Sequence, residues 1–422
     1  MTAAKVRLMS KKSRFAVVAF LALCAWPATA DKATQSLSIV ATPAMMEPAY
    51  LAIATDPAFG TSFVKITAPG QQLLPGLRCG AAYCTHRYSS AQAWNADQSL
   101  LVIANGCNGL CFLDGRTYKP LFSRPVANEC EWHPTDPNVM ICVLADQIYS
   151  WNPRLDTRTR IFSSTNYANL QFGPYKGNPS RDGSRLVVRA TRRGGSQVAF
   201  AYDIATRTKY ADINLGLLQG KNNFCSISPS GLYILCDQTS LFGHNTAYVF
   251  DINGRQRQHW TEHHRPGHGD MTIDADGRDV YVGVSKSDPD KYHVVKRSLV
   301  DGLVTSIADF GDCQHASTRS INRAGWVFLT YIGSYQQAVS NPNMLPFYQE
   351  VVALRIDGSG EVRRIVQTRN AKYDYWSESH ASPSPDGSFV IWSSNWGRPG
   401  GPVADYVAKV EWPAAVMSKL ER

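Results

Sequence analysis

The sequence is poor in charged residues: Asp, Glu, Lys and Arg make up 18% of its 422 residues, whereas 44% are hydrophobic. Intrinsically disordered chains combine low hydrophobicity with high charge density, so this composition excludes a chain that is disordered throughout. The excess of Ala, Glu, Lys and Leu at heptad spacing that marks a coiled coil is also absent. Beyond the N-terminal region no segment approaches the ~18 apolar residues of a membrane-spanning helix, so we expect no membrane span.

Motifs of several enzyme classes are missing as well. The sequence contains no Gly-x-Ser-x-Gly elbow, no Walker loop and no His-Glu-x-x-His. The Arg192-Arg193 and Arg363-Arg364 pairs are too scattered for a nucleic-acid footprint, so no nucleic-acid partner is expected.

Residues 1–30 have the features of a signal peptide. Five basic residues and no acidic one precede an apolar run from Phe15 to Trp26, which is too short to span a bilayer. Small residues predict cleavage after Ala30, and an uncleaved anchor is the alternative. We therefore expect an exported protein, periplasmic or secreted, whose residues 31–422 form one domain. Cleavage leaves 38 basic against 34 acidic residues, so bulk charge does not point to a polyanion.

Cysteine spacing predicts a set of disulfides. Nine cysteines remain after cleavage, and eight are close neighbours in sequence: Cys79/Cys84, Cys107/Cys111, Cys130/Cys142 and Cys225/Cys236. Export permits disulfides, and the last two pairs each span about one β-hairpin, where a cross-strand bridge is possible. Buried thiols are the alternative, because spacing does not prove connectivity. Pairing these eight leaves Cys313 as the odd cysteine.

The chain is built from repeats. Turn signals such as Asp182-Gly183, Asp276-Gly277 and Asp386-Gly387 recur with a period of roughly 40 to 48 residues, apart from one longer step. Each turn is followed by apolar strands, a pattern typical of β-propeller blades. We predict an all-β fold, a seven-bladed β-propeller with four-stranded blades. Independent hairpin domains are the alternative.

The same pattern predicts how the ring closes. The seventh repeat ends at residues 406–410 without an outer strand, and residues 63–67 resemble the missing strand. Pairing this N-terminal strand with the last repeat would hide two exposed edges. Insertions at 334–349 and 397–402 are candidate binding loops.

Three consecutive repeats open with histidine, at His268, His315 and His380. The first strand of each blade lines the channel, so these residues converge near the axis. Cys313 precedes His315 by two residues, and on a strand both would project to the same side. We predict that Cys313 and the three histidines bind Zn²⁺. The alternative is that the histidines only hydrogen-bond the backbone.

These segments also carry a resemblance to a known family. The residues that carry it are Asp-Pro-Ala-Phe-Gly-Thr at 56–61, Trp94-Asn95-Ala96-Asp97, Gly267-His268-Gly269-Asp270, Cys313-Gln314-His315-Ala316-Ser317 and His-Ala-Ser-Pro-Ser-Pro-Asp-Gly at 380–387. With them the chain resembles the seven-bladed propeller polysaccharide lyases, the oligogalacturonate and ulvan lyases, with TolB-like propellers as broader relatives. The resemblance implies a metal among channel histidines, catalytic in the first type and structural in the second. The cysteine favours structural Zn²⁺, because a closed site containing a thiolate leaves no open position.

The resemblance also implies β-elimination from a uronic acid. That reaction needs positive charge or strong donors on the uronate carboxylate, a base at C5 and an acid for the leaving oxygen. Side chains of suitable types near the channel mouth are His86, Tyr88, His133, Arg319 and Tyr375. Structural alternatives stay open: His133 could cap its strand, and Arg319 could pair with Asp270 or Asp312.

We therefore predict an exported, monomeric polysaccharide lyase that acts on an anionic, uronate-containing polysaccharide. The alternative is a non-catalytic TolB-like periplasmic propeller that binds protein or glycan. A hydrolase is disfavoured, because no close pair of acidic residues marks the starts of the repeats.

Overall fold

The structure is a computed structural model that describes residues 37–125, 129–172, 177–239, 246–261, 266–285, 288, 291–308, 313–331 and 345–412. The predicted signal peptide lies outside the described residues, as do residues 334–344 of the first insertion. Within the described ranges, no helix has the length and apolar character needed to cross a bilayer.

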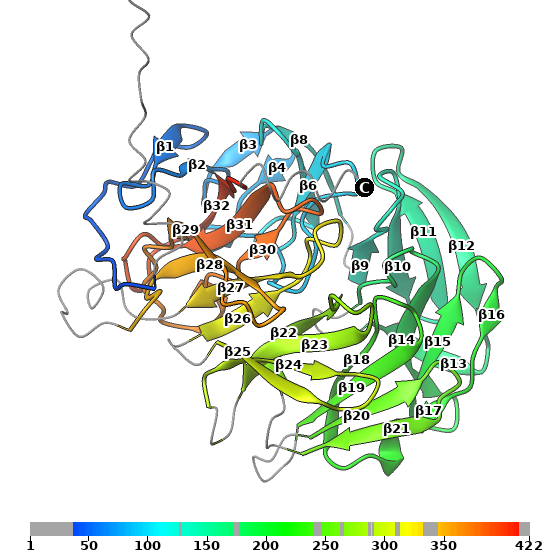
Figure 1. The fold of residues 1–422 in the computed structure, drawn as a ribbon. Helices are drawn as coiled ribbons and strands as arrows, with labels where there is room; N and C mark the ends of the chain where they lie inside the picture. Colours follow the sequence, from blue (N-terminus) through cyan, green and yellow to red (C-terminus); the bar gives the residue numbers. More distant parts are fainter. Residues whose placement is uncertain are drawn as a thin grey trace, which may run out of the picture.

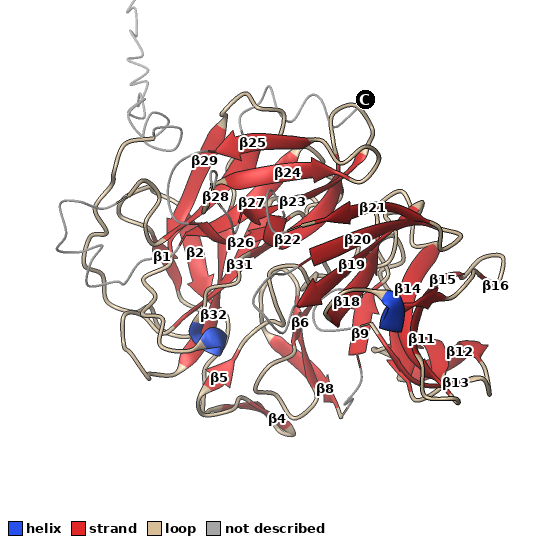
Figure 2. Ribbon diagram, turned by 90° about the horizontal axis from the view of Figure 1, so that it is seen from below, coloured by secondary structure: helices blue, strands red, loops and turns tan. Residues whose placement is uncertain are grey.

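Seven blades follow one another around a ring, which confirms the predicted propeller (Figure 1). Almost all regular structure is strand, and the two helices shown in Figure 2 are short 3-10 turns, η1 (Leu215–Leu217) and η2 (Tyr375–Ser377). Blade one has three named strands, and the bridge between Trp94 and Leu101 adds the innermost position.

The strands are, in blade one, β6 (Leu100–Ile103), β7 (Leu110–Asp114) and β8 (Pro120–Arg124); in blade two, β9 (Glu129–Trp132), β10 (Met140–Leu144), β11 (Gln147–Asn152) and β12 (Thr157–Ser163); in blade three, β13 (Tyr167–Gln171), β14 (Arg185–Arg192), β15 (Gln197–Asp203), β16 (Thr208–Lys209) and β17 (Ile213–Asn214); in blade four, β18 (Lys221–Ile227), β19 (Tyr233–Thr239), β20 (Thr246–Asp251) and β21 (Gln256–Trp260); in blade five, β22 (Pro266–Ile273), β23 (Asp279–Ser285), β24 (Val294–Ser298) and β25 (Val304–Ala308); in blade six, β26 (Cys313–Ser317), β27 (Trp326–Tyr331), β28 (Glu350–Arg355) and β29 (Val362–Gln367); and in blade seven, β30 (Ser382–Pro383), β31 (Phe389–Ser394), β32 (Val403–Lys409), β2 (Ser62–Lys65) and β1 (Ile53–Thr55). Three short strands, β3 (Gln72–Leu74), β4 (Leu77–Arg78) and β5 (Tyr83–Cys84), connect β2 to blade one.

The core is divided among the contacts between blades. Buried apolar side chains of the described residues fall into clusters, and each cluster lies between two neighbouring blades. Together the clusters occupy every junction between blades around the ring. The second strand of a blade is therefore covered on both faces, and β23 is buried along its entire length. Each blade therefore shares its buried apolar surface with both of its neighbours.

The N-terminal strand closes the ring as predicted. β2 pairs antiparallel with β32, with Phe63 opposite Ala408, Val64 opposite Val407 and Lys65 opposite Tyr406. The Phe63 ring packs edge-on against Trp392 at 5.7 Å between centroids. β1 pairs with the other side of β2, so β2 and β32 both have partners on each side, and closure joins blade seven to the segment that precedes blade one.

All four predicted disulfides are present in the structure. Cys130 faces Cys142 across β9 and β10, and Cys225 faces Cys236 across β18 and β19. Their Cα atoms are 4.1 Å apart in both pairs. Cys313 is buried and takes no part in a disulfide.

Candidate functional site

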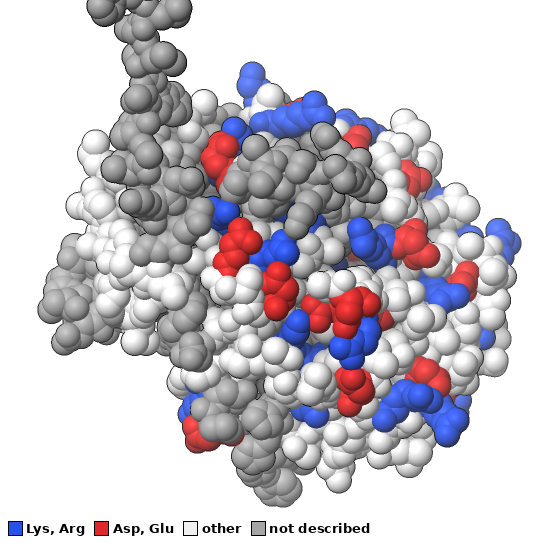
Figure 3. All heavy atoms as spheres, viewed as in Figure 1, with Lys and Arg blue, Asp and Glu red and all other residues white. Residues whose placement is uncertain are grey.

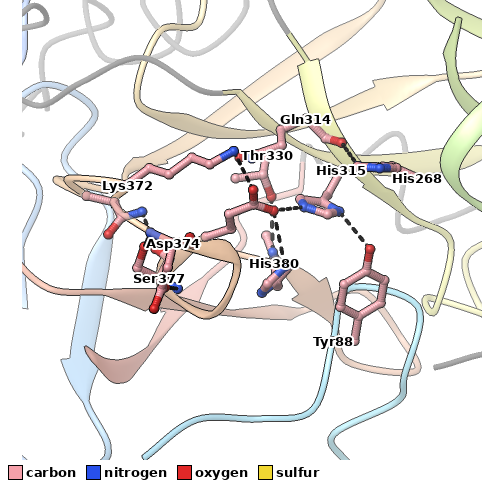
Figure 4. A network of polar contacts seen from close by, with 12 residues as sticks. Tyr88, His268, Gln314, His315, Thr330, Lys372, Asp374, Ser377 and His380 are labelled. Carbon is pink, nitrogen blue, oxygen red and sulfur yellow. Dashed lines mark hydrogen bonds and ion pairs between the residues drawn. The ribbon is translucent and has the colours of Figure 1, made fainter. Parts of the chain in front are cut away.

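The starts of blades six and seven bring together three side chains of types that can ligate a metal ion. His315 belongs to β26, and Glu378 and His380 belong to the segment that leads into β30. All three are buried, and their ligand atoms lie within 4.8 Å of one another. His315 Nε2 is 2.6 Å from Glu378 Oε2, and His380 Nε2 is 3.5 Å from the same oxygen (Figure 4). The three donors therefore face one another.

His380 is positioned through its backbone. Its φ is 45°, in the left-handed region that residues with a Cβ seldom adopt. His86 Nε2 donates to the His380 carbonyl at 2.7 Å, and His86 Nδ1 lies 3.0 Å from Asp405 Oδ1. A carbonyl and a carboxylate only accept, so His86 carries a proton on each nitrogen. Burial opposes this charge, but Asp405 raises the pKa of His86. The pair fixes the backbone that aims the His380 ring.

Glu378 lies on a segment held by its own hydrogen bonds. Asp374 caps η2, because its side chain accepts the N–H of Ser377 at 2.8 Å while Ser377 Oγ accepts the N–H of Asp374 at 3.0 Å. This reciprocal capping satisfies both N–H groups. Asn370 Nδ2 also donates to the Ser377 carbonyl at 2.6 Å. The turn thus delivers the Glu378 carboxylate to the buried site.

The charges around Glu378 keep it ionised. Lys372 Nζ lies 2.5 Å from Glu378 Oε1, and the lysine side chain is 48% exposed. Burial favours the neutral acid, but contacts with His315, His380 and Lys372 hold the pKa of Glu378 below its ordinary value. Burial and the neighbouring His380 lower the pKa of His315 well below its usual range. A carboxylate beside neutral imidazoles is the ionisation state that binds a divalent cation.

Two tyrosines and a third histidine surround these donors. The Tyr88 hydroxyl is 3.3 Å from His315 Nδ1, and the Tyr88 ring stacks on Tyr375 at 6.2 Å. His268 of β22 stacks on His315 at 4.9 Å, and its Nδ1 lies 3.1 Å from the Gln314 carbonyl (Figure 4). The carbonyl only accepts, so Nδ1 of His268 carries the proton and Nε2 is the basic nitrogen. His268 is exposed, whereas His315 is completely buried.

Known proteins were compared with the whole chain. No protein-family model matches it, and no curated protein matches its sequence. Among solved structures, it is similar to an oligogalacturonate lyase in complex with manganese, with a TM-score of 0.59 and 14% identity over 87% of this chain and 97% of that one. An oligogalacturonate lyase from Vibrio parahaemolyticus gives a TM-score of 0.57 and 12% identity over 86% and 97%. A putative TolB from Agrobacterium tumefaciens gives a TM-score of 0.35 and 15% identity over 64% of this chain and 100% of that one.

The first two likenesses establish the fold. Both span almost the full length of the neighbour, so the chain has the complete propeller architecture that those structures share.

The structure places Cys313 apart from the three donors. A β-bulge lies between Cys313 and His315, since Cys313 pairs with Tyr331 while His315 pairs with Thr330. The extra residue breaks the two-residue alternation of the strand. The Cys313 side chain packs in the apolar cluster between blades five and six, whereas His315 faces Glu378. The expectation of a closed zinc site depended on this sulfur, and the group in the structure contains the Glu378 carboxylate instead.

Arg319 and His133 lie further along the channel. Arg319 makes a two-point ion pair with Asp270, with Nε 2.6 Å from Oδ2 and Nη2 2.8 Å from Oδ1, which is the structural alternative left open above. His133 follows β9, and its Nδ1 accepts the N–H of Asp136 at 3.0 Å. Both line one pocket near the ends of the inner strands, whereas His315, Glu378 and His380 stand at the starts.

The predicted catalytic residues are thus divided. The structure brings Tyr88 and Tyr375 beside the donors and places His86 against the His380 backbone. The residue that the sequence interpretation missed is Glu378, although it stands only two residues before the repeat-opening His380 in the sequence. Lys372 gives no comparable signal, because it lies in a loop.

The donor set fits a divalent transition-metal ion. His380 Nε2 is buried, and its contact with Glu378 Oε2 at 3.5 Å is longer than an ordinary hydrogen bond, so a bound cation would satisfy this nitrogen better. Two imidazoles and a carboxylate suit Zn²⁺ and its neighbours. Three protein ligands leave coordination positions for a substrate, as in catalytic sites.

Proposed function

We propose that this chain is an exported lyase that cleaves an anionic, uronate-containing polysaccharide or oligosaccharide by β-elimination. The observation that carries the proposal is the group of His315, Glu378 and His380 beside the basic nitrogen of His268 and the hydroxyl of Tyr88. The structural neighbours named as oligogalacturonate lyases support it, and one of them is a manganese complex. The four disulfides support an oxidising compartment.

A divalent cation held by these three ligands would neutralise the uronate carboxylate and make the C5 proton more acidic. His268 Nε2 is the base that takes this proton, because the ring is exposed and its other nitrogen is committed to the Gln314 carbonyl. Burial and the neighbouring Tyr375 raise the pKa of Tyr88 well above its usual value. The phenol therefore keeps its proton and donates it to the leaving oxygen.

The test is a direct assay of elimination. Purified mature protein is incubated with pectin, ulvan, glucuronan and alginate, and the absorbance of the unsaturated uronate product is followed. We expect absorbance to rise with at least one of them, to stop after chelation and to return when a divalent ion is added. The control His133→Gln should retain the wild-type rate, because that side chain lies elsewhere in the channel. No product from any of the four substrates would overturn the proposal.

The metal content of variants distinguishes the ligand set predicted from the sequence, which includes Cys313, from the set of His315, Glu378 and His380. Elemental analysis of wild-type protein should give about one divalent ion per chain, and Cys313→Ala should keep it because the sulfur lies in the apolar cluster. His380→Ala should lose the ion. Loss of the ion from Cys313→Ala, with retention in His380→Ala, would restore the thiolate site predicted from the sequence.

A further inference from the structure

Three large aromatic side chains are exposed on one short segment beside the candidate site. Tyr373 is 41% exposed, Tyr375 40% and Trp376 41%. The other tryptophans of the described chain are buried or partly buried, so Trp376 is the exception. A cluster of exposed aromatic rings on a soluble domain marks an interaction site. We call these three residues the aromatic platform.

The platform is rigid before any ligand binds. Its turn is closed by the capping between Asp374 and Ser377 described above. Asp374 also accepts a hydrogen bond from the Tyr83 hydroxyl, and Tyr373 donates to the same hydroxyl at 3.3 Å. Tyr83 itself is tied down by the Cys79–Cys84 disulfide next to it in sequence. Rings fixed in this way lose little conformational entropy on binding.

The platform is continuous with the candidate active site. The Tyr375 ring centroid is 5.4 Å from that of His380, and the ring stacks on Tyr88. Lys372 precedes the platform, and its side chain is half exposed. Figure 4 shows this side chain reaching toward the site. Asp374 does not oppose this positive charge at the surface, because its carboxylate is engaged within the turn. Lys372 is already paired with the buried Glu378 carboxylate, but its ammonium group has three donors and is half exposed, so it can also contact a second carboxylate.

We propose that the aromatic platform is a sugar subsite, which binds the pyranose ring next to the one that reacts. A uronate ring matches it, since its C–H face can stack on an aromatic ring while its carboxylate pairs with Lys372. This inference rests on the proposed function, and it adds that the substrate must extend at least one sugar beyond the reacting bond, toward Trp376. The platform then selects longer chains by affinity and not by the chemical step.

Binding is measured apart from cleavage. Metal-stripped protein is titrated with di-, tri- and tetragalacturonate, and with maltotetraose as a neutral chain of equal length to the tetramer. We expect tetragalacturonate to protect Trp376 from acrylamide quenching, and Trp376→Ala to bind it about tenfold more weakly. Trp376→Phe should recover most of the affinity, and the control Trp412→Phe, near the Gly387 turn, should bind as wild type. In turnover, Trp376→Ala should raise KM for the tetramer and leave kcat unchanged.

The outcomes distinguish this inference from the proposed function. Protection of Trp376 by tetragalacturonate without any cleavage would sustain the platform and overturn the lyase. Cleavage with the same chain-length dependence in wild type and Trp376→Ala would overturn the platform alone. Equal binding of maltotetraose would overturn the role of Lys372 and the anionic ligand. Protection of Trp376 that rises with protein concentration, without sugar, would identify a second copy of the chain as the occupant and overturn the sugar subsite.

Discussion

Under the proposed function, Glu378→Gln is expected to abolish cation binding and to slow uronate elimination by at least about 100-fold. The glutamate supplies the negative ligand of the group and contacts His315, His380 and Lys372. Loss of a residue that only orients a metal ligand already costs about 10- to 100-fold in affinity or activity, so loss of a ligand charge should exceed that range. Elemental analysis after gel filtration and initial rates on the cleaved polysaccharide measure the two effects.

Glu361→Gln is the matched control. Glu361 is a glutamate of blade six that pairs with Arg363 at 3.0 Å, and its side chain is 34% exposed. This pair contacts none of the three candidate ligands, so metal content and rate should both stay at the wild-type level. If Glu378→Gln is folded by circular dichroism and keeps both ion and rate, the metal assignment is wrong. Loss of rate with full metal content would make Glu378 a proton-transfer group instead of a ligand.

The propeller could be predicted because its repeats are local. Each blade is a run of hairpins, and turns such as those at Gly183 and Gly387 take positive φ values that glycine adopts without strain. The last repeat lacked an outer strand and residues 63–67 belonged to no repeat, so the sequence predicted that these two would pair, and β2 does pair with β32. The cysteine pairs followed from the same hairpins, because residues opposite each other on neighbouring strands are close enough to bridge.

The direction of side chains at the site could be predicted only where the strand is regular. The two-residue spacing was applied to Cys313 and His315, but the bulge between them turns the sulfur toward the apolar cluster. Glu378 and His380 also stand two residues apart and meet at 3.5 Å, but they lie outside any strand and His380 has a φ of 45°, so alternation does not account for their contact. Alternation alone does not reveal a bulge, because bulges depend on the pairing of the neighbouring strand.

Partners far apart in sequence could not be predicted. His86 binds Asp405 from 319 positions away, and this contact turns a candidate catalytic histidine into a buried support for His380. Arg319 reaches Asp270 on the neighbouring blade. A repeat pattern shows which residues line the channel, but the depth at which each lies depends on how the blades pack.

The site depends on the closed ring, because its residues come from blades five, six and seven and from the segment before blade one. A buried ion pair supports this closure. Asp56 Oδ2 accepts a hydrogen bond from Arg369 Nη1 at 2.8 Å, and neither side chain is exposed. Asp56 lies in the turn between β1 and β2, while Arg369 begins the segment that continues to Glu378. The pair therefore ties the closing strand to the segment that carries the site.

Asp56→Ala is expected to lower the free energy of unfolding by at least about 3 kcal/mol, because it leaves the Arg369 charge buried and unpaired and removes the acceptor of three backbone N–H groups. Urea unfolding followed by fluorescence measures the change. The control Asp276→Ala removes an ion pair with Arg278 in which both side chains are exposed, and should leave the free energy of unfolding close to that of the wild type. An equally small effect of Asp56→Ala would show that the pair does not support closure.

The double variant Asp56→Leu with Arg369→Met separates the charge from the hydrogen bonds. Removing both partners leaves no unpaired buried charge, so it should be more stable than Asp56→Ala. Full recovery is not expected, because Asp56 also accepts the backbone N–H groups of Ala58, Phe59 and Gln367 at 2.9, 3.1 and 3.2 Å. Each buried N–H left without an acceptor costs about 1–3 kcal/mol. A double variant as unstable as Asp56→Ala would therefore mean that these backbone contacts, and not the ion pair, hold the closing segment in place.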